Sequence, residues 1–268
     1  MSGRILVERV GALVTLTLDN PNKRNAVTPA MLLELAGLAR SLAEDLSVRV
    51  LVLQGAGDAF CSGFDVSALP DVAAVSDEAA DFPGADVLAV AAEALCACPQ
   101  PVVAVVRGPC YGAGGELAIC ADFRVSDGSA SFCMPPAKLG LVYSAEGLHR
   151  FARVLGVQTT RDLFYTARVV RCAEAHSMGL LDRVWQADDF ADELSLFCTM
   201  LADNAPLSLR GTKKILQDFV APATWSQLDP GQARGQIAQL RMHAFRSYDH
   251  AEGRAAFVSK RKPVFEGR

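Results

Sequence analysis

The chain has 268 residues, of which 51% are hydrophobic and 21% are charged, and its formal net charge is -4. This length allows one large domain, or one domain with a smaller appendage. The mildly acidic balance lacks the basic face that is typical of nucleic-acid binders, so we expect no nucleic-acid partner.

The N-terminal segment MSGRILVERVGALVTLTLDNP alternates polar and apolar residues, which predicts two strands over residues 4–18 around Gly11. It is not a signal peptide, because Glu8 interrupts the apolar stretch and no continuous apolar h-region is present. No window of 18 apolar residues follows, so we expect no membrane span or membrane partner. These features predict a cytoplasmic protein.

The eight cysteines are scattered, and most have apolar neighbours, as reduced cysteines of a core do. Cys96 and Cys98 form the only close pair, and no second pair or histidine follows at zinc-finger spacing. We therefore expect no structural zinc.

Strand and helix patterns then alternate along the chain. A helix is predicted in NAVTPAMLLELAGLARSLAEDL (25–46), with Thr28 as its N-cap and Pro29 at its first position. The next predicted elements are a strand at 49–55, a loop entering a short helix at 59–69, a polar loop at 71–86, a helix to about Cys98 and a buried strand at 100–108.

Short strands are predicted at DFRVSD (122–127) and ASFCMP (130–135), and from 145 onward the pattern is mostly helical. The last part, 205–268, contains helical patterns only, including a long amphipathic stretch that ends at Tyr248. Strand followed by helix, repeated, predicts an α/β protein. We expect a core over 1–204 and a C-terminal helical region over 205–268.

The segment GPCYGAGGELAIC (108–120) places Gly112, Gly114 and Gly115 directly before Glu116. It is not a Walker A loop, which ends in Gly-Lys-Ser/Thr, and it fails the dinucleotide fingerprint, which needs glycine at Leu117. A helix N-terminus also suits an oxygen that becomes negative only during reaction, because its unpaired amides carry partial positive charge. The segment therefore favours an oxyanion hole with an acid–base group one turn away, although tight packing and a dipole-complementing glutamate are simpler interpretations.

The segments GPCYGAGGELAICADFRVS (108–126), LDNPNKRNAVTPAM (18–31) and AFCSGFDVSAL (59–69) resemble the enoyl-CoA hydratase/isomerase (crotonase) superfamily in order and spacing. So do APLSLRGTKKIL (205–216) and FVSKRKPVF (257–265). The resemblance implies a crotonase-like spiral of ββα units with C-terminal helices used in trimer assembly, as a homotrimer or a dimer of trimers. It also implies a coenzyme A thioester as substrate, no permanently bound cofactor, and an enolate stabilised by two backbone amides.

In this sequence the family pattern places those two amides on Phe64 and Ala113, and it makes Glu116 the main acid–base residue. Asp65 can also cap the short helix that follows it. Lys260, Arg261 and Lys262 form the densest basic cluster, which is predicted near the coenzyme A phosphates or is a solvated tail. The residues that the resemblance assigns to coenzyme A binding are Arg24, Ala26, Ser62, Phe64, Asp65, Val66 and Lys260.

The chain departs from a two-glutamate hydratase, because the second family glutamate falls at Pro136, which cannot transfer a proton. Glu146 is a candidate for the second acid–base group, and Tyr143 is a candidate hydrogen-bond donor to substrate. We expect an enoyl-CoA hydratase-like lyase. The alternatives are a methylmalonyl-CoA decarboxylase-like enzyme, which the stretch around Tyr143 also resembles, and a non-catalytic acyl-CoA-binding protein. A dehalogenase is disfavoured by Ser144 and by a histidine-free segment at 71–95.

Overall fold

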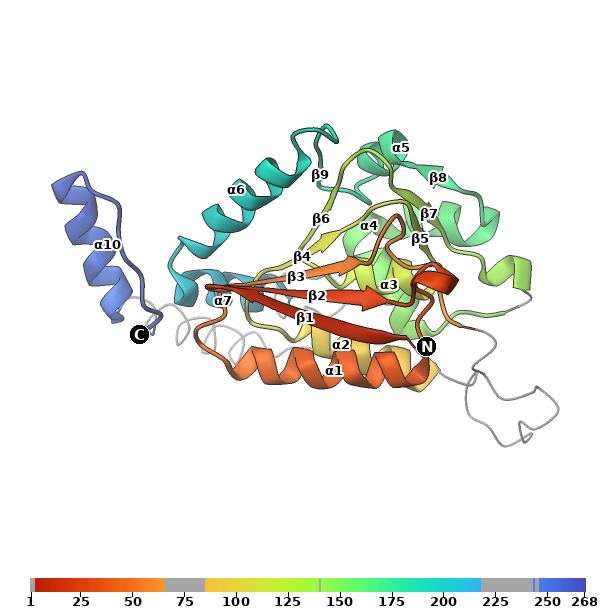
Figure 1. The fold of residues 1–268 in the computed structure, drawn as a ribbon, viewed down its shortest axis with the longest axis horizontal. Helices are drawn as coiled ribbons and strands as arrows, with labels where there is room; N and C mark the ends of the chain where they lie inside the picture. The colour runs from red at the N-terminus through yellow and green to blue at the C-terminus, as the bar shows by residue number, and fades with distance from the viewer. Residues whose placement is uncertain (1–2, 66–84, 140, 218–242, 244–245) are drawn as a thin grey trace.

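The computed structural model describes residues 3–65, 85–139, 141–217, 243 and 246–268. Within these residues the strands form a six-stranded sheet in the order β1-β2-β3-β4-β6-β9 and a three-stranded sheet in the order β5-β7-β8. Strands β1 and β2 are antiparallel, and the other neighbours in the large sheet are parallel (Figure 1). The strands are β1 Arg4–Val10, β2 Leu13–Asp19, β3 Val50–Gly55, β4 Val102–Val105, β5 Pro109–Tyr111, β6 Phe123–Ser126, β7 Ser131–Cys133, β8 Val170–Arg171 and β9 Arg183–Val184.

The first helix begins where its capping residues predict. Helix α1 starts at Pro29 as predicted, and the Thr28 side chain accepts a hydrogen bond from the Met31 N–H at 3.2 Å. The described helices are α1 Pro29–Glu44, α2 Ala85–Cys96, α3 Ala113–Ile119, α4 Ala145–Thr166, α5 Cys172–Ser177, α6 Phe190–Ala202, α7 Pro206–Ile215 and α10 Tyr248–Ser259, with short 3-10 helices η1 Pro21–Lys23 and η4 Pro136–Leu139.

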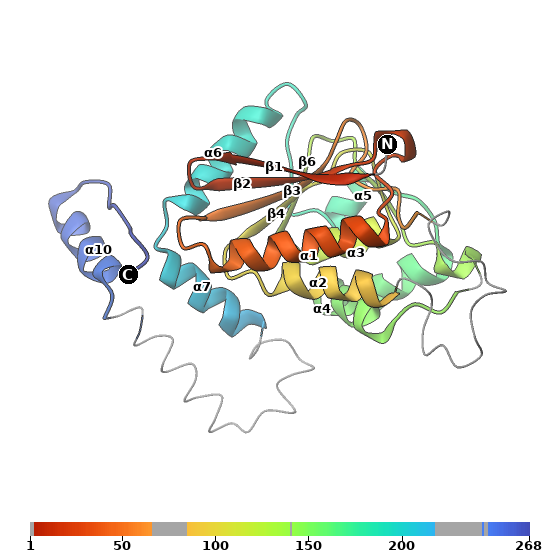
Figure 2. The same ribbon diagram turned by 60° about the horizontal axis from the view of Figure 1, so that its bottom comes forward.

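The central strands β3 and β4 of the large sheet are buried on both faces, and alternate residues of these strands enter different cores. Leu51 and Leu53 of β3 belong to the cluster that includes the buried side chains of α1 and α2. Val50 and Val52 instead pack with Phe190 and other residues of α6. Figure 2 shows α1 and α2 on one side of the sheet and α6 on the other. This burial explains why the strands have near-continuous apolar sequences.

The predicted hairpin, the first helix, the strands at 49–55 and 100–108 and the two short strands after the glycine loop are all confirmed. Strands β5, β8 and β9 were not predicted, because each has only two or three residues and is defined by pairing with a distant segment. The short helix after Asp65 and most of the amphipathic stretch before Tyr248 lie outside the described residues. So does the predicted loop at 71–86, except for its last two residues, which begin α2.

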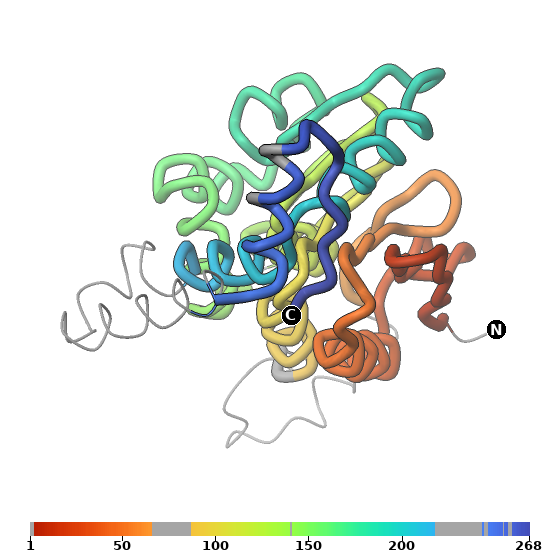
Figure 3. The backbone as a smooth tube through the Cα atoms, turned by 90° about the vertical axis from the view of Figure 1, so that its left-hand side faces the viewer, coloured from red at the N-terminus to blue at the C-terminus, as the bar shows by residue number. Residues whose placement is uncertain are grey.

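The C-terminal helices α7 and α10 differ in how they contact the rest of the chain. Lys213 of α7 is buried, and its Nζ donates to the Gln100 carbonyl oxygen at 2.9 Å and to Asp122 Oδ2 at 2.6 Å. Helix α10 lies beyond α7 at one end of the molecule, and Figure 3 shows it in front when that end faces the viewer. Lys213 thus attaches α7 to the core through two hydrogen bonds. The division between a core and a C-terminal helical region at 204/205 stays a prediction.

Among the helices that the structure describes, none is both long enough and apolar enough to cross a membrane. All eight cysteines are free, and seven of them are buried, which confirms the predicted core cysteines. The described residues contain no group of three or more histidine, cysteine, aspartate or glutamate side chains that is arranged to hold a metal ion.

Candidate active site

Two backbone segments lie side by side after the carboxyl ends of β3 and β4. The Cys61 N–H donates to the Pro109 carbonyl at 3.0 Å, and the Tyr111 N–H donates to the Cys61 carbonyl at 2.9 Å. Gly112 has a φ of 50°, and a Cβ added to it would lie 3.9 Å from the Gly63 Cα. The left-handed conformation at Gly112 therefore turns the chain into α3 beside the loop that contains Phe64.

The backbone amides of Phe64 and Ala113 are the two predicted oxyanion donors. Within the described residues, neither N–H donates to a backbone carbonyl, whereas the N–H of Asp65 donates to Val27 and that of Gly112 donates to Cys133. Ala113 is the first residue of α3, a position whose N–H has no partner inside the helix. Both amides are thus available for an external acceptor.

The glycine loop also has a packing role. A Cβ at Gly114 would lie 2.7 Å from the Cys61 Cβ, which is closer than two such atoms can approach. Gly114 therefore permits α3 to pack on the 59–65 segment. The packing interpretation is thus confirmed, and the same close packing places the start of α3 beside the 59–65 segment, while the oxyanion hole stays a prediction.

Glu116 lies in the first turn of α3, and only 1% of its surface is exposed. The Tyr143 hydroxyl donates to Glu116 Oε2 at 2.5 Å. The Arg150 guanidinium donates to Glu116 Oε1 at 2.7 Å through Nη1. Each carboxylate oxygen therefore has one strong donor, and the side chain is held in one orientation.

The protonation states of the two partners follow from their surroundings. Burial first, and then the charge of Glu116, raise the pKa of Tyr143 well above its usual value, so the phenol keeps its proton. Burial acts to lower the pKa of Arg150, but Cys120 and Glu116 raise it above the ordinary arginine value. The cluster is therefore a protonated tyrosine and a cationic arginine around one glutamate.

Arg150 was missed by the sequence analysis. It lies on α4, three residues after buried Gly147 and one before buried Phe151, so it belongs to the inward face of the helix. An arginine on the buried face of a helix requires an anionic partner, so its position in the helical pattern could have indicated a buried ion pair. The sequence does not say which acid faces it.

Cys96 and Cys120 lie beside this cluster. A hydrogen bond with the Cys120 thiol is the main cause that lowers the pKa of Cys96 to about 7, against the opposing effect of burial. The positive charges of Arg150, Arg153 and Lys213 lower it further. Cys96 is half-buried, and its lowered pKa reflects in part the positive charges near Glu116.

The other candidates near Glu116 occupy different places. Tyr143 is in contact with Glu116, as described, and its ring also packs against Phe164. Pro136 is buried at the start of η4. Glu146 is exposed in the first turn of α4, and no hydrogen bond or ion pair joins it to Glu116 in the described part of the chain. The structure thus brings Tyr143, but not Glu146, to the carboxylate.

Most of the predicted coenzyme A-binding residues lie in two interlaced segments. The Val27 N–H donates to Gly63, the Asp65 N–H donates to Val27, and the Ser62 N–H donates to Arg24. The Lys23 Nζ donates to Asp65 Oδ2 at 2.7 Å. Arg24, Ala26, Ser62, Phe64 and Asp65 are therefore close together, whereas Val66 lies outside the described residues.

Asn25, which lies between Arg24 and Ala26, has a structural role, and the predicted coenzyme A-binding residue Lys260 lies elsewhere. Asn25 is fully buried, and its Nδ2 donates to the carbonyls of Ala56 and Ala59, so it holds the two segments together. Lys260 directly follows α10, which lies at the opposite end of the molecule from η1 (Figure 1). A single chain therefore does not bring Lys260 to the Arg24 segment.

The family model for enoyl-CoA hydratase/isomerase matches residues 8–268 of this chain. Carnitinyl-CoA dehydratase of Escherichia coli is 32% identical over 273 residues, with 100% of both chains covered. Crotonyl-CoA hydratase of Syntrophomonas wolfei is 29% identical over 262 residues, with 97% of both chains covered. The solved structure of an enoyl-CoA hydratase from Bacillus anthracis superimposes with a TM-score of 0.87 at 27% identity, covering 99% of this chain and 100% of that one.

The chain belongs to the enoyl-CoA hydratase/isomerase family. The predicted crotonase fold and the predicted class of acyl-CoA-processing enzyme are thereby confirmed. The particular reaction depends on the groups around Glu116.

Proposed function

We propose that this enzyme catalyses the reversible addition of water to the double bond of an enoyl-CoA thioester, with Glu116 as its single acid–base carboxylate. The observation that carries the proposal is the position of Glu116. It is buried, fixed by Tyr143 and Arg150, and located one turn from the unpartnered N–H of Ala113.

The proposed chemistry begins at the thioester carbonyl, which accepts hydrogen bonds from the N–H groups of Phe64 and Ala113. These donors stabilise the negative oxygen that forms when the hydroxyl of water adds to Cβ. Glu116 takes the proton of that water and delivers it to Cα, so the carboxylate returns to its starting state. One carboxylate is sufficient for this sequence, which accommodates Pro136 at the second family position.

Tyr143 and Arg150 are positioning residues in this proposal, because they act on the substrate through Glu116. Arg150 holds one oxygen of the carboxylate through an ion pair, and Tyr143 fixes the direction of the other oxygen. Glu146 has no place in the sequence of steps, since it is exposed and does not contact Glu116.

For the substrate, we propose that the segments around Arg24 and Ser62 bind the coenzyme A portion. The distance of α10 from these segments supports a contribution of Lys260 from a neighbouring chain in a homotrimer or a dimer of trimers (Figure 1).

The test is a mass-spectrometric assay with crotonyl-CoA and other enoyl-CoA esters, with methylmalonyl-CoA in parallel. We expect the enoyl esters to gain one water and to reach an equilibrium from either side. Loss of carbon dioxide from methylmalonyl-CoA, with enoyl esters unchanged, would replace the proposal by decarboxylation. Thermal stabilisation by every ester without any product would identify a binding protein.

A further inference from the structure

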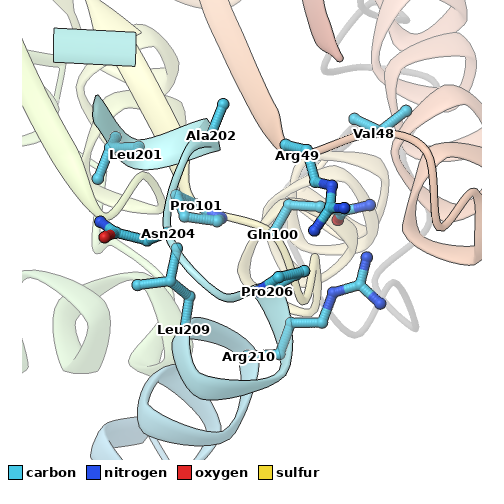
Figure 4. Close-up of a pocket in the computed structure, with 10 residues that line it drawn as sticks. All are labelled: Val48, Arg49, Gln100, Pro101, Leu201, Ala202, Asn204, Pro206, Leu209 and Arg210. Carbon is cyan, nitrogen blue, oxygen red and sulfur yellow. The ribbon is translucent and has the colours of Figure 1, made fainter. Parts of the chain in front are cut away.

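A small cavity lies at the amino ends of β3 and β4, opposite the candidate active site. It has a volume of about 10 Å³ and is lined by residues just before β3, the segment before β4, the end of α6 with the α6–α7 turn, and the first half of α7. Figure 4 shows Arg49 and Arg210 extending their guanidinium groups toward one another there, with Gln100 beside Arg49. We refer to it as the Arg49–Arg210 cavity.

Three polar atoms of residues that line this cavity are buried and have no hydrogen-bond partner among the residues that the structure describes, namely Arg49 Nη1, Arg210 Nη2 and Gln100 Oε1. The side chains of Arg49 and Gln100 are not free to turn away. Arg49 Nη2 donates to the Phe265 carbonyl at 2.8 Å, and Gln100 Nε2 donates to the Leu42 carbonyl at 2.6 Å. A buried polar group without a partner costs about 1–3 kcal/mol, and more when it is charged, so the two guanidinium N–H groups require an acceptor that the described residues do not supply.

The local charge decides which kind of partner fits. Arg49 and Arg210 both line the cavity, and no acidic residue does so in the described part of the chain. Burial first, and then the positive charge of Arg49, lower the pKa of Arg210. The nearest preceding acids in sequence have other partners, because Asp45 pairs with Arg9 and Asp203 pairs with Lys262. Two cations therefore face each other without compensation, although the chain as a whole is acidic.

We propose that the Arg49–Arg210 cavity binds one small anion, either a halide ion or a single oxygen of a carboxylate or phosphate that reaches in from solvent. The cavity has room for about one water-sized group. A water molecule would satisfy the two N–H donors and Gln100 Oε1, but it would leave both positive charges uncompensated. An anion between the guanidinium groups accepts both N–H donors and offsets their repulsion, although it donates nothing to the Gln100 Oε1 acceptor.

The bound anion would join segments that are far apart in sequence. Arg49 directly precedes β3 and holds the C-terminal tail through Phe265, while Arg210 belongs to α7. The anion therefore stabilises the attachment of the C-terminal region to the sheet. This site is independent of the reaction at Glu116, which lies at the other end of the strands.

The first test is direct detection in crystals of the unmodified protein soaked in bromide. We expect an anomalous scattering peak between Arg49 Nη1 and Arg210 Nη2. The second test compares thermal unfolding of the parent and of Arg210→Gln as chloride, acetate or phosphate is added to equal ionic strength. The anion that binds should raise the Tm of the parent by about 2–4 °C more than that of the variant at tenfold excess over its Kd.

Arg161→Gln is the matched control, because Arg161 is exposed on α4 and its loss removes the same charge without touching the cavity. It should respond to each salt as the parent does. The salt that distinguishes parent from variant identifies the source of the anion. A water molecule without any bromide peak would overturn the proposal, and so would equal salt responses of the parent and Arg210→Gln.

Discussion

At the carboxyl end of the parallel strands, the buried carboxylate of Glu116 has one donor on each oxygen, from Tyr143 and Arg150. At the amino end, two arginines face one cavity with a buried N–H of each left without a partner. A buried charge is expensive unless it is paired, so these regions meet the same requirement differently. Glu116 is paired with an arginine of the same chain, whereas the Arg49–Arg210 pair is proposed to bind an external anion.

The contrast also separates two kinds of function. A paired carboxylate has a fixed position before substrate arrives, and proton transfer requires such positioning. An unpaired cation pair is suited to capture an ion. Substitutions that remove one charge from either region should therefore have different consequences.

The largest expected effect is on turnover, through Glu116→Gln. This change keeps the size of the side chain but removes its ability to carry a proton, so turnover should fall by about 10²–10⁴-fold. Binding of acyl-CoA, measured by calorimetry, should remain. Glu193→Gln on the exposed surface of α6 is the control. Full activity of Glu116→Gln would mean that the buried carboxylate has only a structural role, so the two regions would not differ in function as proposed.

The next effect is on stability, through Arg150→Gln. The variant leaves the Glu116 charge buried without its counter-ion, which typically costs about 3–5 kcal/mol of the free energy of unfolding. Urea unfolding of Arg150→Gln, Glu116→Gln and the double variant measures how strongly the pair is coupled. We expect the double variant to be more stable than the sum of the single effects. Strict additivity would contradict the ion pair.

Removal of one oxyanion donor is expected to cost about 10²–10³-fold in rate. Ala113→Pro does this, because proline lacks the N–H yet fits the first position of a helix, where the structure places Ala113. Ala145→Pro is the matched control at the first position of α4. Turnover is measured on the substrate that the mass-spectrometric assay identifies. If Ala113→Pro folds and keeps the parental turnover, the glycine loop serves only for packing.

The smallest expected effect is on the reactivity of the Cys96 thiol, which lies near Arg150. Its thiol has a pKa of about 7, so the rate of alkylation by iodoacetamide should rise between pH 6 and 8 and level off above, where the thiolate predominates. Arg150→Gln removes one of the charges that favour the thiolate and should slow alkylation at pH 7 about twofold. Peptide mapping by mass spectrometry gives the rate at Cys96. A midpoint near the ordinary value of 9.0 would contradict the assigned surroundings.

Local sequence patterns predicted those parts of the protein that depend on neighbouring residues. Thr28 and Pro29 mark the start of α1 because a cap and a fixed φ act within one turn. The glycine loop and Glu116 were found in the same way, since a strand, a turn and a helix N-terminus follow one another along the chain. The order of family motifs then supplied the candidate donors Phe64 and Ala113.

The tertiary structure alone decided which charges are paired. Arg150 is 34 residues from Glu116, and its helical face predicts burial but not the acid that it meets. Likewise, nothing in the sequence around Arg49 or Arg210 distinguishes them from solvated arginines. The physical reason is that the free energy of a charge depends on burial and on partners within a few ångströms, and for these residues both are fixed only when distant segments pack together.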